Sequence, residues 1–214
     1  METNPKPQQT MKEAAFETIK SHIVNGDWEG GTFLSEKYLS ELLQMSKTPI
    51  RSALDRLEMM GLVKLSPKQG IVVQNMSLKK VLEVYELRLA LETFAAGRLT
   101  GKLSSGLIAG LEDNLAKQET AVRLEDINRY IALDREFHEL LVSGLDNDEF
   151  IDAMSRMQDK FMMALKTSFI KNKERLWGSY TEHRGIFQAY VGSDPAAAQA
   201  LVAAHIEFVK TVML

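Results

Sequence analysis

Apolar residues recur at helical spacing in three short runs near the start of the chain, and polar turn residues separate these runs. The first run predicts a helix of about three turns that ends at Asn25 and Gly26. The second run predicts a helix over residues 36–44, with Ser35 as its N-cap. The side chains expected to face inward from these two helices are Phe16, Ile19, Ile23, Leu39, Leu42 and Leu43.

The third run lies within residues 46–61 and predicts a further helix. Thr48 is expected to be its N-cap and Pro49 its first helical residue, where the missing N–H group of proline costs no hydrogen bond. Gly61 can end the helix in a left-handed conformation. The second and third helices together form a predicted helix-turn-helix. The buried face of the third helix is expected to contain Ile50, Leu54 and Leu57.

Polar side chains occupy the outward face at the start of this third helix. Two cations and a hydroxyl at a helix start suit insertion into the major groove of DNA, N-terminus first. An ordinary amphipathic helix with a solvated charged face has the same pattern, so this helix alone leaves both interpretations open. The outward residues are Lys47, Thr48, Arg51, Ser52 and Asp55.

After Gly61 the hydrophobic pattern changes from helical spacing to short strand-like runs. Residues 62–66 and 71–74 predict two strands, and residues 67–70 predict the turn between them. This hairpin is either the wing of a winged helix, with its tip near a nucleic-acid backbone, or a plain hairpin that seals the core. The order of helix, helix-turn-helix and hairpin favours the wing.

From Ser77 onward helical spacing continues without strand-like alternation. Breaks rich in Gly, Asn, Asp and Ser divide this part into antiparallel helices, which pack as a bundle with a buried interior. The predicted fold class is therefore mainly α: a winged helix-turn-helix of three helices and a β-hairpin wing, followed by a six-helix bundle. The expected bundle helices span residues 78–100, 104–123, 126–143, 147–169, 172–191 and 195–213.

The composition of the 214-residue chain, with 45% hydrophobic and 26% charged residues, is typical of a globular protein. Its net charge of −3 means that DNA binding would depend on where the cations point and on doubling by a dimer. The absence of cysteine excludes disulfides and thiolate metal sites. No apolar run is long enough to cross a membrane, and the polar residues 1–10 predict a disordered arm, so a cytoplasmic protein is expected.

Four polar residues fall on otherwise apolar faces of the predicted bundle helices. Asp134 and His138 lie one turn apart on one helix, whereas His183 and His205 lie on two others. If these side chains converge, they form a mixed nitrogen and oxygen site for Zn²⁺, Ni²⁺ or Mn²⁺, with positions left for water or a ligand. A histidine taken singly is more often a hydrogen-bonded core residue, and the residues alone leave the two interpretations open.

Four segments of the N-terminal part carry a family pattern: Gly31-Thr-Phe-Leu-Ser-Glu-Lys-Tyr-Leu-Ser-Glu-Leu-Leu, Met45-Ser-Lys-Thr-Pro-Ile-Arg-Ser-Ala-Leu-Asp-Arg-Leu, Gly61-Leu-Val and Gln69-Gly-Ile. With these segments, this part resembles the winged-helix domain of the GntR family of bacterial regulators. The family usually has arginine where this chain has Lys47, which can neutralise a phosphate but lacks the planar fork that reads guanine. Arg51 is expected to read a base. The DNA contacts that the resemblance implies are Lys37, Lys47, Thr48, Arg51, Gln69 and Gly70.

The predicted bundle contains the patterns Leu-Asp-x-x-Phe-His-x-x-Leu around His138, Glu-His-x-x-Ile around His183, and a histidine in the last helix. With these patterns, the bundle resembles the metal-binding form of the FCD ligand domain of the FadR subfamily. Six helices rather than seven resemble its VanR-type branch. Arg88 matches an arginine that would grip an effector carboxylate, and its alternative partner is Glu92, one turn away. The resemblance implies a divalent transition metal, zinc before nickel or manganese, on Asp134, His138, His183 and His205.

These features lead to the hypothesis of a metabolite-responsive transcriptional regulator, a repressor that binds a palindromic operator as a homodimer. A small organic or sugar acid at the metal would favour one spacing of the two DNA-reading domains. The DNA-binding domain is expected over residues 11–76, and the effector-binding and dimerisation domain over residues 77–214. The alternatives are a metal-dependent enzyme acting on small carboxylates, with Glu182 as a general base, and a DNA-binding protein whose metal is purely structural.

Overall fold

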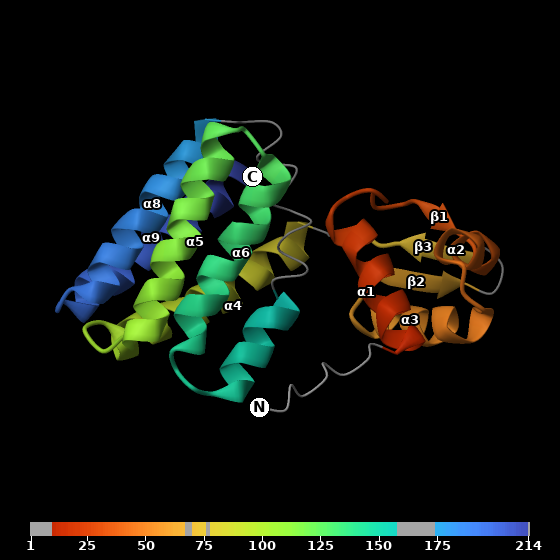
Figure 1. The fold of residues 1–214 in the computed structure, drawn as a ribbon, viewed down its shortest axis with the longest axis horizontal. Coiled ribbons are helices and arrows are strands. Elements are labelled where there is room, and N and C mark those ends of the chain that lie inside the picture. The colour runs from red at the N-terminus through yellow and green to blue at the C-terminus, as the bar shows by residue number, and fades with distance from the viewer. Residues whose placement is uncertain (1–9, 67–69, 76–77, 158–173, 214) are drawn as a thin grey trace, which may run out of the picture. The chain divides into compact units, whose positions relative to one another are not determined.

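The computed structural model describes residues 10–66, 70–75, 78–157 and 174–213 (Figure 1). The chain divides into two compact units, Met1–Met76 and Ser77–Leu214, which are described separately. Residues 1–9 of the predicted arm lie outside the described residues. Thr10, at the end of that arm, is the N-cap of the first helix, and its side chain accepts a hydrogen bond from the backbone N–H of Glu13.

The first unit combines three helices with a small antiparallel sheet whose strand order is β1-β3-β2 (Figure 1). The sequence pattern predicted the helices and the hairpin but missed β1, a two-residue strand that pairs with Ile71 and Val72. A strand this short has no periodicity of its own, and its partner lies far along the chain. The elements are α1 (Met11–Val24), β1 (Phe33–Leu34), α2 (Glu36–Leu43), α3 (Lys47–Met59), β2 (Val63–Ser66) and β3 (Gly70–Val73).

The predicted start of α3 was two residues too late. Thr48 is not the N-cap, because Ser46 has the extended conformation of a cap (φ −67°, ψ 164°) and the helix begins at Lys47. Pro49 is the third helical residue, and it still costs no hydrogen bond because the first four N–H groups of a helix have no acceptor within it. The predicted end is confirmed: α3 stops at Met59, and Gly61 has a left-handed φ of 72°.

The core of the first unit centres on α3, which packs against α1, α2 and β2. Leu39 is fully buried and Leu43 is half-buried, but Leu42 is 45% exposed, so the prediction that all three face inward was wrong for Leu42. Since α2 is only about two turns long and packs mainly on α3, it buries a single apolar side chain. The remaining buried positions on α1 and α3 include Phe16, Ile19, Ile23, Ile50, Leu54 and Leu57, as predicted.

The second unit is a helical bundle, which confirms the predicted fold class (Figure 1). Residues 148–157 are also helical. Residues 158–173, which contain the rest of the predicted helix 147–169 and the start of 172–191, lie outside the described residues. The other helices are α4 (Leu78–Leu99), α5 (Ser105–Arg123), α6 (Ile127–Ser143), α8 (Glu174–Val191) and α9 (Pro195–Met213).

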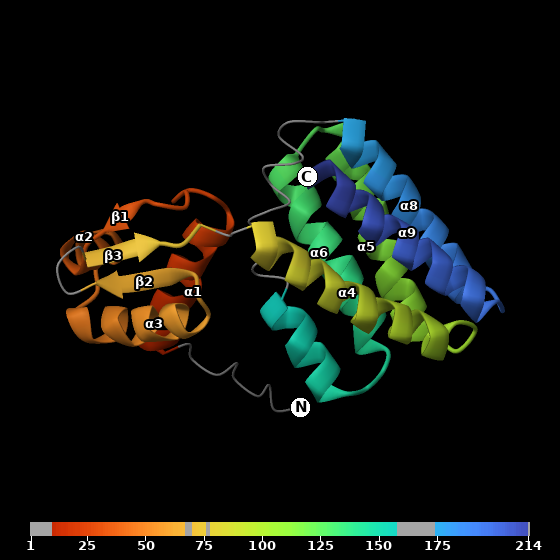
Figure 2. The same cartoon turned by 180° about the vertical axis from the view of Figure 1, so that it is seen from behind.

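The packing of these helices brings distant parts of the chain together. Helix α4 packs against α9 and α6, α5 packs against α6 and α8, and α8 packs against α9 (Figure 2). The three helices that carry the predicted metal ligands, α6, α8 and α9, are therefore bridged by α4 and α5. The buried face of α4 includes a charged pair, Arg88 and Glu92, among apolar residues such as Tyr85 and Ala95.

Candidate metal centre and DNA-binding helix

Three histidines from three helices meet in the interior of the bundle. His138 on α6, His183 on α8 and His205 on α9 are each at most 2% exposed. The Nε2 atom of His183 lies 3.2 Å from Nε2 of His138 and 3.4 Å from Nε2 of His205. The candidate ligand nitrogens all lie within 4.8 Å of one another, so the three imidazoles can hold a metal ion.

Asp134 lies one turn before His138 on α6 and faces the same interior. One carboxylate oxygen, Oδ1, is 3.4 Å from Nε2 of His183, and the other, Oδ2, is buried without a hydrogen-bond partner. Burial raises the pKa of Asp134 to about 6, although Arg88 acts in the opposite direction. A buried carboxylate oxygen without a donor is costly unless a cation binds it. Asp134 therefore lies beside the group of mutually close ligand atoms, which itself consists of the three histidines.

Each of the three imidazoles is oriented from behind by an acceptor on its Nδ1 atom. The acceptors are an amide oxygen and two carboxylates that an arginine holds in the ionised form, so Nδ1 is assigned the proton and donates it. The unprotonated Nε2 atoms then point inward, toward one another. The pairs are Glu92 Oε2 with His138 at 2.7 Å, Gln118 Oε1 with His183 at 2.8 Å, and Glu182 Oε2 with His205 at 2.6 Å.

The inward-facing nitrogens match the requirements of a cation. Burial lowers the pKa of His138 and His183 well below the usual range, and it also lowers that of His205, so the rings are neutral. Their converging lone pairs repel one another unless a cation lies between them. Two nitrogens bound at about 2.0–2.1 Å to one tetrahedral zinc ion lie roughly 3.3–3.4 Å apart. The spacings of 3.2 and 3.4 Å agree with that geometry.

Two buried arginines lie behind the carboxylates of this centre. Arg88 is 1% exposed and donates through Nε to Glu92, which is the salt bridge that the sequence offered as the alternative to an effector contact. Arg175, in the first turn of α8, makes a bidentate pair with Glu182, with both N–O distances 2.7 Å. Burial acts to raise the pKa of Glu182, but the hydrogen bonds from His205 and Arg175 outweigh it and lower that pKa to about 2.

Sequence reasoning missed Gln118 and Arg175 and gave Glu182 a different role. Gln118 did have a signal, since it lies one turn after Asn114 in the buried stripe of α5 and donates to it. Two amides on an otherwise apolar face indicate partners outside the helix. Arg175 and Glu182 are seven residues apart on α8, a spacing equally typical of a surface pair. Both oxygens of Glu182 are engaged, which suits a group that orients His205 rather than a general base.

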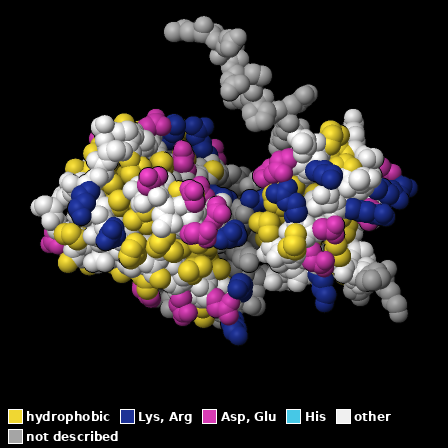
Figure 3. Space-filling model, turned by 90° about the horizontal axis from the view of Figure 1, so that it is seen from below, with side chains coloured by type: hydrophobic (Ala, Val, Ile, Leu, Met, Phe, Trp, Pro, Cys, Tyr) yellow, Lys and Arg dark blue, Asp and Glu magenta, His cyan; other side chains and the backbone are white. Residues whose placement is uncertain are grey.

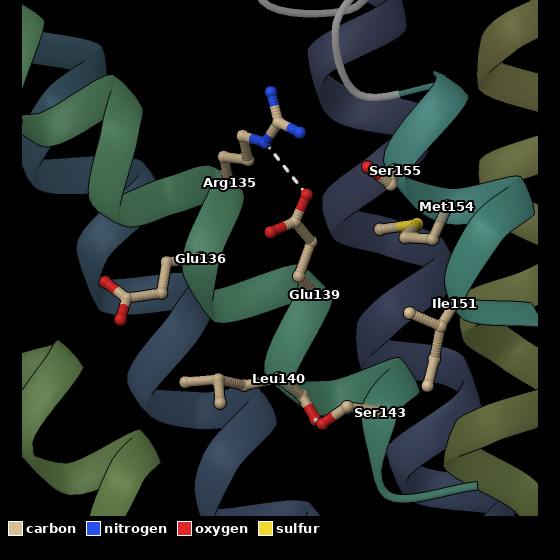
Figure 4. A pocket seen from close by; sticks show the side chains of 8 residues that line it. All are labelled: Arg135, Glu136, Glu139, Leu140, Ser143, Ile151, Met154 and Ser155. Carbon is tan, nitrogen blue, oxygen red and sulfur yellow. Dashed lines mark hydrogen bonds and ion pairs between the residues drawn. The ribbon is translucent and has the colours of Figure 1, made fainter. Parts of the chain in front are cut away.

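A separate cavity of about 290 Å³ lies between α6 and the helical residues 148–157 (Figure 4). On its α6 side, Arg135 and Glu139 form an ion pair at 2.8 Å, and Glu136 points toward the opposite side of α6. None of the four predicted metal ligands lines it, so this cavity is distinct from the histidine cluster. The lining residues are Arg135, Glu136, Glu139, Leu140, Ser143, Ile151, Met154 and Ser155.

Four of the predicted DNA-binding residues lie on the exposed surface of α2 and α3. Lys47, Thr48 and Arg51 occupy the exposed start of α3, and the side chain of Lys37 on α2 is 82% exposed. Nε of Arg51 lies 2.8 Å from Oε1 of Glu36 on α2. Exposed ion pairs of this kind contribute little free energy, so the guanidinium can exchange Glu36 for another acceptor.

At the wing, only one of the two predicted tip residues belongs to the described part of the chain. Gly70 begins β3 with a φ of 79°, and a Cβ atom there would lie 3.0 Å from the carbonyl oxygen of Leu34. Both facts favour glycine at this position. Gln69 lies outside the described residues. In Figure 3, Lys and Arg side chains project from the visible face of this unit with acidic side chains between them.

Two protein-family models match the chain, one for each unit. The model of the bacterial regulatory proteins of the gntR family matches residues 11–73. The FCD domain model matches residues 83–208, which is more than half of the chain. Among the described residues, no helix is long and apolar enough to cross a membrane.

Curated relatives of the chain are transcriptional regulators. The HTH-type transcriptional repressor RspR of Escherichia coli is 26% identical, over 97% of this chain and 90% of the relative. An uncharacterised HTH-type regulator, YdhC of Bacillus subtilis, is 28% identical, over 89% and 85%. A regulator of Agrobacterium vitis is 33% identical, over 61% of this chain and 78% of the relative. All three are named as transcriptional regulators, which favours a regulator over the enzymatic alternative.

Solved structures show the same fold at low sequence identity. Escherichia coli McbR/YncC superposes with a TM-score of 0.85 at 19% identity, covering 96% of this chain and 98% of the other. A GntR transcriptional regulator from Rhodococcus sp. RHA1 gives a TM-score of 0.83 at 18% identity, covering 94% and 96%. Because both family models and the curated relatives agree, the chain belongs to the GntR family of bacterial regulatory proteins. It carries an FCD domain and is a DNA-binding transcriptional regulator.

Proposed function

We propose that this regulator binds one divalent transition metal through Asp134, His138, His183 and His205, and that zinc is the preferred metal. A small organic or sugar acid would bind at this metal and change the affinity of the protein for its operator. The observation that carries the proposal is the convergence of three buried Nε2 atoms, each with its Nδ1 atom engaged from behind. Such an arrangement presents three lone pairs to a single point, where a cation is the favourable occupant.

The charges around the centre support an anionic effector. Among the described residues, Arg88 and Arg175 act on the buried carboxyl groups of Asp134, Glu92 and Glu182, and with all five groups ionised the formal charge is −1. A divalent cation turns this charge to +1, which favours one further anion. The carboxylate of an effector, bound through one oxygen at an open position of the metal, would be this anion. Arg88 is the proposed second contact of the effector; because Nε holds Glu92, this contact would involve its Nη atoms.

In the proposed mechanism, the domain over residues 77–214 senses the effector and dimerises, and the domain over residues 11–76 binds DNA. A homodimer is proposed because a single reading domain buries too little surface for a specific site. Effector binding would favour one spacing of the two reading domains and release the operator, so that the protein acts as a cytoplasmic repressor. The proposed DNA contacts are Lys37, Lys47, Thr48, Arg51, Gln69 and Gly70.

Thermal unfolding of the metal-loaded and chelator-treated protein tests the sensing role. We expect metal to raise the melting temperature, and a screen of organic and sugar acids to contain members that raise it further only when metal is bound. A ligand at one hundred times its dissociation constant stabilises the folded state by about 2.7 kcal/mol, which gives a shift of several degrees. If metal stabilises the protein but no acid adds to the effect, the metal is structural and the sensing proposal is wrong.

The roles of Arg51 and Lys47 can be separated by binding to operator and to random DNA. Arg51→Ala is expected to weaken operator binding by roughly tenfold to a hundredfold and random-DNA binding much less, because a base contact is worth about 1–3 kcal/mol. Lys47→Ala is expected to weaken both alike and to lower the salt slope by about one, because it neutralises a phosphate. Equal losses on both DNAs for Arg51→Ala would reduce its role to a backbone contact.

A further inference from the structure

The three imidazoles of the centre are held by unlike partners. His183 donates to the neutral amide oxygen of Gln118, whereas His138 and His205 donate to carboxylates. Each of these two carboxylates is in turn held by a buried arginine on its own helix. On α4 this pair is fully buried, but on α8 the side chain of Glu182 is 32% exposed while that of its arginine is 5% exposed.

The geometry of the α8 pair fixes the carboxylate that faces His205. Nη1 and Nη2 of Arg175 reach the two oxygens of Glu182 at 2.7 Å each, so the guanidinium and carboxylate planes are locked together. The oxygen that accepts from Nη2, Oε2, also accepts from Nδ1 of His205 at 2.6 Å. The direction of that hydrogen bond therefore depends on where Arg175 holds the carboxylate.

Arg175 is also held from the helix that carries His205. Its guanidinium carbon lies 4.5 Å from the ring centroid of Phe208, which follows His205 by three residues on α9. The arginine thus contacts both helices that meet at this corner of the centre. Lysine would not reproduce these contacts, since it has neither the two-pronged donor geometry nor the flat face.

We infer that Arg175 is a positioning residue of the metal centre, which acts through Glu182 on the orientation of His205. The inference rests on the proposed metal site and assigns Arg175 no contact with the metal. In this series of contacts, Glu182 keeps the proton of His205 on Nδ1, so the Nε2 lone pair of His205 points inward. Arg175 keeps the carboxylate of Glu182 in the orientation that this hydrogen bond requires. Arg175 would thereby set metal affinity from the outer layer of the site.

A double-mutant cycle on metal affinity tests this chain of contacts. Co²⁺ is the probe, because its visible absorption reports ligand geometry and a competing chelator gives the affinity. Arg175→Ala and Glu182→Ala are each expected to weaken Co²⁺ binding by about 10- to 100-fold and to alter the absorption spectrum. The double variant is expected to bind no more weakly than Glu182→Ala, because Arg175 has no route to His205 without Glu182.

Two further variants keep the outcome interpretable. Arg184→Ala removes an exposed arginine of the same helix and is expected to leave both affinity and spectrum unchanged. Arg175→Lys keeps the positive charge beside Glu182 and supports folding if the alanine variant is unstable. Its affinity is expected to fall between those of the wild type and Arg175→Ala, because charge without the planar fork restores the contact only in part.

The results separate this inference from the metal proposal beneath it. If the wild-type protein binds neither Co²⁺ nor Zn²⁺, the metal proposal itself is wrong. If the wild type binds Co²⁺ and Arg175→Ala binds it equally well with the same spectrum, only the role of Arg175 is wrong. Losses that multiply in the double variant would also overturn the inference, because they would show that Arg175 acts independently of Glu182.

Discussion

Replacement of His183 by alanine is expected to abolish metal retention. Its Nε2 atom is the central one of the cluster, within 3.4 Å of Nε2 of both other histidines and of Oδ1 of Asp134. Loss of an outer-layer partner alone typically costs 10- to 100-fold in metal affinity, so loss of a ligand at the centre is expected to exceed about 100-fold. Metal content after dialysis and calorimetric titration with Zn²⁺ would measure this loss.

The same variant is expected to keep its affinity for operator DNA in the absence of effector, because His183 lies in the second unit. His22→Ala is the matched control: this histidine lies in the first unit, is partly exposed and pairs with Asp27. It is expected to retain metal like the wild type. A His183→Ala protein that still binds zinc tightly, or that loses metal yet still responds to an effector, would contradict the assignment of the pocket.

Replacement of Arg88 by alanine is expected to lower the free energy of unfolding by about 3–5 kcal/mol, because it leaves the carboxylate of Glu92 buried without its counter-charge. Arg88 and Glu92 are 1% and 0% exposed and lie one turn apart on α4. Arg123 and Glu119 form a pair with the same spacing on the surface of α5, so Arg123→Ala is the matched control and is expected to change little. Urea unfolding of the metal-free proteins gives both values.

This experiment also distinguishes the two roles of Arg88. Arg88→Lys keeps a positive charge beside Glu92, so it is expected to recover much of the lost stability. Lysine lacks the planar fork of arginine, so it cannot bind Glu92 and an effector carboxylate at the same time. The rise in melting temperature on addition of organic acids is therefore expected to stay smaller than in the wild type. If organic acids raise the melting temperature of Arg88→Lys as much as that of the wild type, Arg88 does not contact the effector and its role is the salt bridge to Glu92.

Local periodicity predicted most of the fold because most of its elements are defined by short-range features. The apolar stripe of α1 and the left-handed Gly61 after α3 are signals that each segment carries by itself. Errors arose where a segment depends on a distant partner. The strand β1 exists only through its pairing with β3, and Leu42 is exposed because α2 packs mainly on α3.

The candidate site was predicted unevenly for the same reason. Asp134 and His138 share a helix face by their spacing alone, and His183 and His205 were candidates because they lie on otherwise apolar helix faces; only the resemblance to the FCD domain favoured one site made by all four. No local pattern distinguishes Arg175 from a solvated arginine, because its burial depends on how α8 and α9 pack.

By itself, the sequence determined the order of helices, turns and hairpin, and the residue types available for a metal site, since both follow from composition and local spacing. Tertiary structure decided which of these residues meet. The convergence of three imidazoles, and the pairing of each with a partner 23 to 65 residues away, depends on contacts between separate helices. Such contacts are set by the packing of whole faces, a property that no single segment contains.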